Sequence, residues 1–170
     1  MRKQDISILC AEDEPSLQHV FASQLHALGY KKPEFVTNGL MAVKLAKQKR
    51  FDIIFMDLRM PELDGISATQ RIREGEAGTG SRVPIVGLSA YSRRQNCLEA
   101  GMDEYLQKPV LLYQVDEMLT RFLDVAPEAS KLRDEPVKPK IDSTLLEKSN
   151  ERLISIQKKI DELRKMGESE

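Results

Sequence analysis

Five residues with reactive side chains lie at the ends of four short strand-like stretches of the sequence. They are Glu12 and Asp13 after residues 6–11, Asp57 after residues 52–56, Ser89 at the end of residues 84–89, and Lys108 after residues 104–107. Each residue alone has an ordinary structural explanation, because polar residues commonly cap helices or form turns where strands end. Their presence at four strand ends favours a shared site with three carboxylates, a hydroxyl and an ammonium group.

A cluster of carboxylates needs a cation, because like charges held close together repel one another. Oxygen ligands without histidine or cysteine suit Mg²⁺, which binds through a few carboxylates and retains several waters. Such a site is equipped for phosphoryl transfer, since the metal and the lysine neutralise phosphoryl oxygens while a carboxylate accepts the group. The stretch GEAGTG (75–80) lacks the Gly-Lys-Ser/Thr ending of a nucleotide-binding loop. The phosphoryl group is therefore expected to arrive on another molecule.

Five short stretches, most of them continuously apolar, are expected to form the strands that position these residues. They are ISILCA (6–11), EFVT (34–37), DIIFM (52–56), PIVGLS (84–89) and EYLQ (104–107). Continuous apolar character is typical of parallel strands covered on both faces, and helix-like patterns separate the stretches. The order predicts an α/β fold with a doubly wound five-stranded parallel sheet over residues 5–123. In such a fold ligands bind beyond the carboxyl ends of the strands.

The composition is that of a globular protein, with 41% hydrophobic and 31% charged residues. A formal net charge of −1 gives no general attraction to nucleic acid or to an anionic membrane. No apolar run reaches the length of a membrane-spanning helix or of a signal peptide. The two cysteines, Cys10 and Cys97, lack the CxxC spacing and are predicted to be buried, reduced thiols. We therefore expect a soluble, cytoplasmic protein.

The residues beyond the predicted α/β domain differ from it in composition. Residues 124–141 contain three prolines and many charges and are predicted to form a linker. Residues 142–166 carry leucine and isoleucine at helical spacing, which predicts a C-terminal amphipathic helix. A parallel homodimer of this helix would place Lys159 against Arg164, so packing on the domain, a marginal homodimer and a partner helix with acidic flanks remain alternatives. The balanced charges of the segment disfavour DNA binding.

The sequence resembles the receiver domain of two-component response regulators over about residues 5–123. Four motifs carry the resemblance: ILCAEDEP (8–15), DIIFMDLRMPELDG (52–65), GLSA (87–90) and DEYLQKPV (103–110). The long loop before VPIVGLSA and the stretch CLEAGMDEYLQKPV are most similar to receivers of hybrid histidine kinases. The resemblance implies a flavodoxin-like fold with strand order 2-1-3-4-5.

The resemblance also implies which residues hold the phosphoryl group and the metal. By it, Asp57 is the phospho-acceptor, and Asp57, Glu12, Asp13 and the backbone carbonyl of Arg59 hold Mg²⁺. A histidine kinase or a histidine phosphotransfer protein is the implied donor. The implied output is a changed interaction with a downstream protein, and no chemistry on a substrate beyond self-phosphorylation and autodephosphorylation is expected.

Further residues are implied to switch the domain and to tune its reactivity. Ser89 bonds a phosphoryl oxygen, Lys108 pairs with it, and Tyr105 is the aromatic residue that reorients with Ser89 on activation. Arg59 and Tyr91, two positions beyond the acceptor and the hydroxyl, flank the approach of water in relatives and slow loss of the phosphoryl group. In many relatives the peptide bond that follows the lysine is cis.

Two features depart from the usual pattern of the family. Ser89 stands where threonine is more frequent, and it retains the hydroxyl donor. The segment from Ser89 to Gly101 is about one helical turn shorter than usual, which changes the shape expected for the fourth helix.

Two other functions compete with a phospho-accepting signalling domain. A phosphatase with an aspartyl nucleophile needs a second aspartate two residues later, and Arg59 stands at that position. A docking domain that never needs phosphate has no requirement for the complete reactive set, so the set disfavours it. Turnover of a small phosphate ester would favour the first rival, and failure to label with acetyl phosphate would favour the second.

Overall fold

The computed structural model describes residues 2–90 and 94–123, all of which lie in one compact unit, Met1–Ala126. A short 3₁₀ helix, η1 (Lys3–Asp5), precedes the first strand. The strands are β1 (Ile8–Ala11), β2 (Glu34–Val36), β3 (Ile53–Asp57), β4 (Ile85–Ser89) and β5 (Glu104–Gln107). The helices are α1 (Pro15–Ala27), α2 (Gly39–Gln48), α3 (Gly65–Glu76), α4 (Arg94–Glu99) and α5 (Leu112–Phe122). The predicted linker (124–141) and C-terminal helix (142–166) lie outside the described residues.

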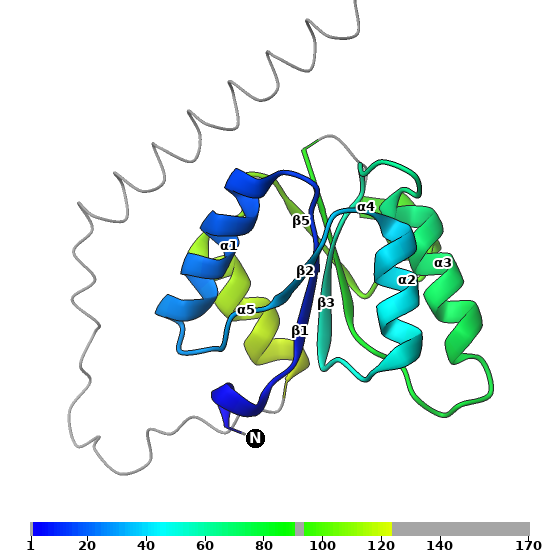
Figure 1. Ribbon diagram of the computed structural model, residues 1–170, viewed down its shortest axis with the longest axis horizontal. Helices are drawn as coiled ribbons and strands as arrows, with labels where there is room; N and C mark the ends of the chain where they lie inside the picture. Colours follow the sequence, from blue (N-terminus) through cyan, green and yellow to red (C-terminus); the bar gives the residue numbers. More distant parts are fainter. Residues whose placement is uncertain (1, 91–93, 124–170) are drawn as a thin grey trace, which may run out of the picture. The chain divides into compact units, whose positions relative to one another are not determined.

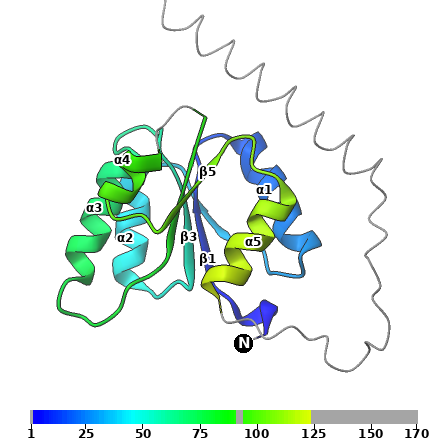
Figure 2. The same ribbon diagram turned by 180° about the vertical axis from the view of Figure 1, so that it is seen from behind.

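The five strands form one parallel sheet in the order β2-β1-β3-β4-β5, as the resemblance implied. Helices α1 and α5 cover one face of the sheet, and α2, α3 and α4 lie on the other (Figures 1 and 2). The predicted α/β fold with a doubly wound sheet is therefore confirmed. Each of the five strands begins and ends within two residues of the stretch predicted for it.

Successive residues of each central strand pack on opposite faces of the sheet, in two different hydrophobic cores. In β3, Ile53 and Phe55 pack in the core beneath α1 and α5, while Ile54 and Met56 pack in the core beneath α2 and α3. Successive side chains of a strand point to opposite faces, so a strand buried on both faces must be apolar throughout. All five residues of β3 are buried, and the last of them is Asp57.

Three of the helices are capped at their amino ends by a side chain that accepts a backbone N–H group. Asn38 caps α2, and Asp64 caps α3. Glu14 caps α1, because its side chain accepts the N–H of Ser16. Asp13 lies in the turn between β1 and α1, beside Glu12.

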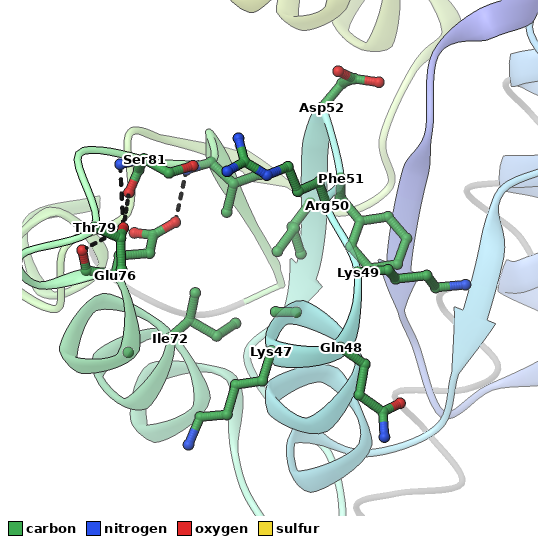
Figure 3. A pocket seen from close by; sticks show the side chains of 14 residues that line it. Lys47, Gln48, Lys49, Arg50, Phe51, Asp52, Ile72, Glu76, Thr79 and Ser81 are labelled. Atoms are coloured by element: carbon green, nitrogen blue, oxygen red, sulfur yellow. Dashed lines mark hydrogen bonds between the residues drawn. The ribbon is translucent and has the colours of Figure 1, made fainter.

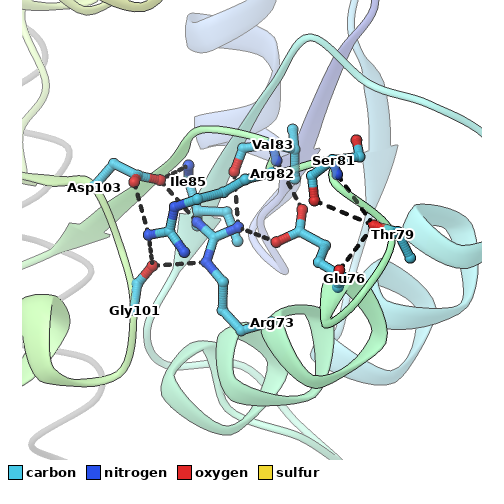
Figure 4. Close-up of polar contacts among 9 residues, drawn as sticks. All are labelled: Arg73, Glu76, Thr79, Ser81, Arg82, Val83, Ile85, Gly101 and Asp103. Carbon is cyan, nitrogen blue, oxygen red and sulfur yellow. Dashed lines mark hydrogen bonds and ion pairs between the residues drawn. The ribbon is translucent and has the colours of Figure 1, made fainter.

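A network around Arg73 ties together the amino ends of β4 and β5 (Figure 4). Arg73 Nη1 donates to Glu76 at 2.6 Å and to the carbonyl of Val83 at 2.9 Å. Its Nη2 and Nε donate to Asp103 at 2.7 Å and to the carbonyl of Gly101 at 2.8 Å. These bonds connect α3 with the loops that precede β4 and β5. They lie at the amino ends of the strands, whereas the reactive residues lie at the carboxyl ends.

Glu104, the first residue of β5, binds an arginine from each neighbouring helix. Its Oε1 accepts from Arg94 of α4 at 2.8 Å, and its Oε2 accepts from Arg121 of α5 at 2.7 Å. Burial by itself would raise the pKa of Glu104, but the hydrogen bonds from Arg121, from the N–H of Tyr105 and from Arg94 outweigh burial and lower the pKa. The charged form of Glu104 therefore stabilises the fold.

The variant Glu104→Gln is expected to lower the free energy of unfolding at neutral pH. A carboxyl group whose pKa is lowered in the folded state contributes stability above its unfolded pKa and loses it as the pH falls through the folded value. The difference between the two proteins should therefore shrink at acidic pH. Urea unfolding at a series of pH values measures it, and a difference that stays constant with pH would contradict this assignment.

Among residues 2–90 and 94–123, no helix is long and apolar enough to cross a membrane. The two cysteines are buried and free, as predicted.

Candidate functional site

The carboxyl ends of β1, β3 and β5 bring together the predicted acidic residues and the lysine. Glu12 and Asp13 follow β1, Asp57 is the last residue of β3, and Lys108 follows β5. A carboxylate oxygen from each of the three acids lies within 4.8 Å of the others. The three carboxylates predicted to converge therefore do so.

Lys108 bridges two of the acids. Its Nζ donates to Glu12 Oε2 at 2.5 Å and to Asp57 Oδ2 at 2.6 Å. The side chains are 8% exposed in Lys108 and 4% exposed in each acid, so solvent screens these ion pairs weakly. The peptide bond between Lys108 and Pro109 is cis.

Burial and mutual charge shift the pKa values of this group. Burial raises the pKa of Glu12 to about 7, with Asp57 adding to the rise and Lys108 opposing it. Burial would lower the pKa of Lys108, but the charges of Glu12 and Asp57 outweigh it and raise the pKa. Lys108 is therefore fixed as a cation between the two carboxyl groups.

The cluster fits a divalent cation. With its acids ionised it contains three carboxylates and one ammonium group, which leaves two negative charges in a largely buried position. The donor atoms are carboxylate oxygens only, and these are the ligands that Mg²⁺ prefers over softer metals.

Ser89 ends β4 beside this cluster, and Tyr105 lies in the neighbouring strand β5. Ser89 is buried at the end of β4, whose neighbour β3 ends at Asp57. The hydroxyl of Tyr105, from β5, donates to the backbone carbonyl of Ser89 at 2.9 Å. The N–H of Lys108 donates to the same carbonyl at 3.0 Å. The structure therefore links the predicted switch pair to each other and to the lysine.

The loop after Asp57 folds back on the side chain of Asp57. The N–H of Arg59 donates to Asp57 Oδ1 at 3.0 Å, so the two oxygens of Asp57 bind different groups. The N–H of Gly65 donates to the carbonyl of Leu58 at 3.0 Å. A Cβ atom on Gly65 would lie 2.2 Å from the backbone oxygen of Asp57. Only glycine permits this approach of α3 to the end of β3.

Sequence patterns did not reveal two glutamines of α1 that hold neighbouring loops. Gln18 Nε2 donates to the carbonyl of Glu12 at 2.6 Å, and Gln24 Nε2 donates to the carbonyl of Val110 at 2.9 Å. Gln24 is buried. The signal available in the sequence was a glutamine placed at the spacing of the apolar face of the helix. Tyr91, predicted to tune reactivity, lies outside the described residues.

A groove of about 550 Å³ lies at the opposite end of the sheet (Figure 3). It is lined by the end of α2, by Arg50, Phe51 and Asp52 before β3, and by residues of α3 and of the loop before β4. None of the predicted site residues lines it. The groove and the acidic cluster are therefore separate features.

Comparisons with known proteins agree with this geometry. The family described as "Response regulator receiver domain" matches residues 8–120. The sensor histidine kinase RcsC of Escherichia coli is 35% identical over 123 residues, which are 71% of this chain and 12% of RcsC. This chain therefore spans a small part of that relative.

Two solved structures share the fold. The receiver domain of a sensor histidine kinase from Pseudomonas aeruginosa, with a magnesium ion in its active-site cleft, is 42% identical at a TM-score of 0.63, covering 71% of this chain and 98% of that one. A chain in the Saccharomyces cerevisiae complex of the histidine phosphotransfer protein Ypd1 and the receiver domain of Ssk1 is 30% identical at a TM-score of 0.65, covering 72% and 90%. Together with the acidic cluster at the carboxyl edge of the sheet, these matches show that the chain belongs to the response regulator receiver domain family of two-component signalling.

Proposed function

We propose that Asp57 accepts a phosphoryl group from a phosphohistidine donor and that the modified domain changes its interactions with other proteins. The observation that carries the proposal is the Lys108 ammonium group, which contacts both the acceptor and Glu12 inside the acidic cluster. The donor is a histidine kinase or a histidine phosphotransfer protein. The yeast complex supports this choice, because there a histidine phosphotransfer protein is bound to a receiver domain.

Asp57 supplies the nucleophile. One of its carboxylate oxygens forms a bond to phosphorus as the phosphorus–nitrogen bond of the donor breaks, and the released imidazole nitrogen takes a proton from solvent. Lys108 Nζ, 2.6 Å from Asp57 Oδ2, lies within reach of an oxygen on the transferring group. The Arg59 N–H bond to Oδ1 orients the carboxylate before transfer.

Glu12, Asp13, Asp57 and the backbone carbonyl of Arg59 would hold Mg²⁺. When bound, the metal supplies positive charge that neutralises the phosphoryl oxygens as the group is transferred. The magnesium ion in the related Pseudomonas aeruginosa receiver supports this assignment.

Ser89 and Tyr105 carry the signal away from the site. Phosphorylation adds about −1.5 to −2 charge next to buried carboxylates, and Ser89 and Lys108 respond by moving towards it. Since the Tyr105 hydroxyl is bonded to the Ser89 carbonyl, movement of Ser89 changes the position of Tyr105. The output is an interaction with a downstream protein and involves neither nucleic acid nor membrane. The C-terminal segment (142–166) would contribute a homodimer contact or bind a partner helix.

Arg59 distinguishes this proposal from a phosphatase. A phosphatase that uses an aspartyl nucleophile needs a second carboxyl group two residues later to protonate its leaving group, and Arg59 has none. Together with Tyr91, Arg59 would instead restrict water near the phosphorylated Asp57 and slow hydrolysis.

The test is labelling of the full chain with acetyl phosphate, a small donor that needs no protein partner. We expect one phosphoryl group per chain, located at Asp57 by mass spectrometry and dependent on Mg²⁺. Removal of the metal with a chelator should abolish labelling. Continuous turnover of a small phosphate ester would instead support the phosphatase, and absence of labelling with Mg²⁺ present would support a phosphate-independent docking domain.

A further inference from the structure

The loop that follows the acceptor is held by the start of helix α2. Asn38 Nδ2 donates to Glu62 Oε1 at 2.7 Å, and the N–H of Gly39 donates to the carbonyl of Leu63 at 3.0 Å. These four residues, which we call the loop clamp, join the β2–α2 turn to the β3–α3 loop. Asn38 is only 8% exposed, so breaking its bond to Glu62 would leave a mostly buried amide without this acceptor.

The backbones of the two segments are in direct contact. A Cβ atom on Gly39 would lie 2.3 Å from the carbonyl oxygen of Leu63 and 2.9 Å from the Cβ atom of Ala68. A backbone oxygen cannot move aside as the end of a flexible side chain can. A small displacement of the start of α2 must therefore displace the loop.

The loop has a strained backbone at the point where the loop clamp holds it. The N–H of Leu63 donates to the carbonyl of Pro61 at 2.7 Å, which closes a three-residue turn around Glu62. Glu62 has a φ of 64° and is the only residue other than glycine with a positive φ in the part of the chain that the structure describes. Such a turn is rare in proteins, and it persists when surrounding contacts hold it. The side chain of Glu62 forms one of these contacts, with Asn38.

The same loop carries the groups that approach the acceptor. Arg59 lies two residues before the strained turn, and its N–H is bonded to Asp57 Oδ1. We infer that Asn38 and Glu62 are positioning residues, which fix the turn and thereby the direction of the Arg59 carbonyl towards Mg²⁺. This inference rests on the proposed function, in which that carbonyl is a metal ligand. Residues that orient metal ligands typically change metal affinity about 10- to 100-fold when replaced.

The two roles of Asn38 must be separated by the choice of variants. Asn38 Oδ1 also accepts the N–H of Met41 at 2.8 Å and caps α2. Asn38→Ser retains a capping oxygen and removes the amide donor. Glu62→Ala removes the acceptor without touching the cap, and Glu62→Gln retains an acceptor oxygen while removing the charge. Glu62→Gln therefore controls for the electrostatic effect of Glu62 on a nearby cation.

The experiment is calorimetric titration of Mg²⁺ into the full chain of each variant. Asn38→Ser and Glu62→Ala should each raise the Kd for Mg²⁺ about tenfold. The double variant should raise it no further, because one contact cannot be lost twice. Glu62→Gln should retain most of the affinity. Ile72→Val, a core change in α3 away from the loop, controls for lower stability and should leave the Kd unchanged.

An unchanged Kd in Asn38→Ser and Glu62→Ala would overturn the inference, as would multiplying effects in the double variant. The amide NMR signal of Arg59 provides a readout that needs no metal, since it should shift in both single variants and stay in place in Ile72→Val. If the wild-type chain neither binds Mg²⁺ nor labels at Asp57, the proposed function itself is wrong and the role of the loop clamp is rejected with it. Wild-type binding without any effect of the variants rejects the loop clamp alone.

Discussion

Replacing Lys108 with alanine is expected to stop phosphoryl transfer to Asp57 and to lower the free energy of unfolding by about 3–5 kcal/mol without Mg²⁺. The change removes the cation that contacts both Glu12 and Asp57, whose side chains are each 4% exposed. Two buried carboxylates then repel each other with no ammonium group between them. Since the pKa of Glu12 is already raised to about 7, the loss should be larger above that pH, where Glu12 is ionised, than below it.

Urea unfolding with and without Mg²⁺ measures this effect. Mg²⁺ should stabilise Lys108→Ala more than it stabilises the wild-type chain, because the metal offsets the same carboxylate charges. Lys49→Ala is the matched control, since the ion pair between Lys49 and Glu34 is exposed at both ends and is worth about 0–1 kcal/mol. Equal losses in the two variants would show that Lys108 does not balance a buried charge.

Replacing Gly65 with alanine is expected to cost about 1–3 kcal/mol of stability and to impair labelling at Asp57. The new Cβ atom would lie 2.2 Å from the backbone oxygen of Asp57 and 2.9 Å from the Cα atom of Leu58. Both are backbone atoms, so relief of the clash must move either α3 or the end of β3 that carries Asp57. Thermal unfolding gives the stability, and labelling with acetyl phosphate gives the reactivity.

Gly75, in the same helix, is the matched control. A Cβ atom there would meet only the end of the Lys47 side chain, at 3.5 Å. Gly75→Ala should therefore raise stability by about 0.5–1 kcal/mol, because alanine favours the helix more than glycine does. The two variants are thus expected to have effects of opposite sign. Equal stability of Gly65→Ala and the wild-type chain would contradict the close packing of α3 on the end of β3.

The strands and the acidic cluster could be predicted from the sequence because both follow from local patterns. Continuous apolar stretches such as residues 52–56 identify strands buried on two faces. In a parallel sheet the carboxyl ends of all strands lie at the same end of the sheet, so Glu12, Asp57 and Lys108 were expected to lie close together. Their bridging by a single ammonium group is the detail that the structure adds.

The loop clamp could not be predicted from the same patterns. Asn38 and Glu62 are separated by 24 positions, and their bond depends on how two loops pack against each other. An Asn-Gly pair such as Asn38-Gly39 is typical of a turn and does not indicate which loop its side chain contacts. The positive φ of Glu62 had no sequence signal at all, because glutamate is an uncommon choice for that conformation.

Glu104 and its two arginines have a consequence for how the sheet meets other chains. Strand β5 is an edge strand, and an exposed edge is a template on which a strand of another molecule can pair and start aggregation. An added strand beside β5 would have to desolvate or break the ion pairs of Glu104 with Arg94 and Arg121. These two ion pairs therefore protect the β5 edge against strand addition.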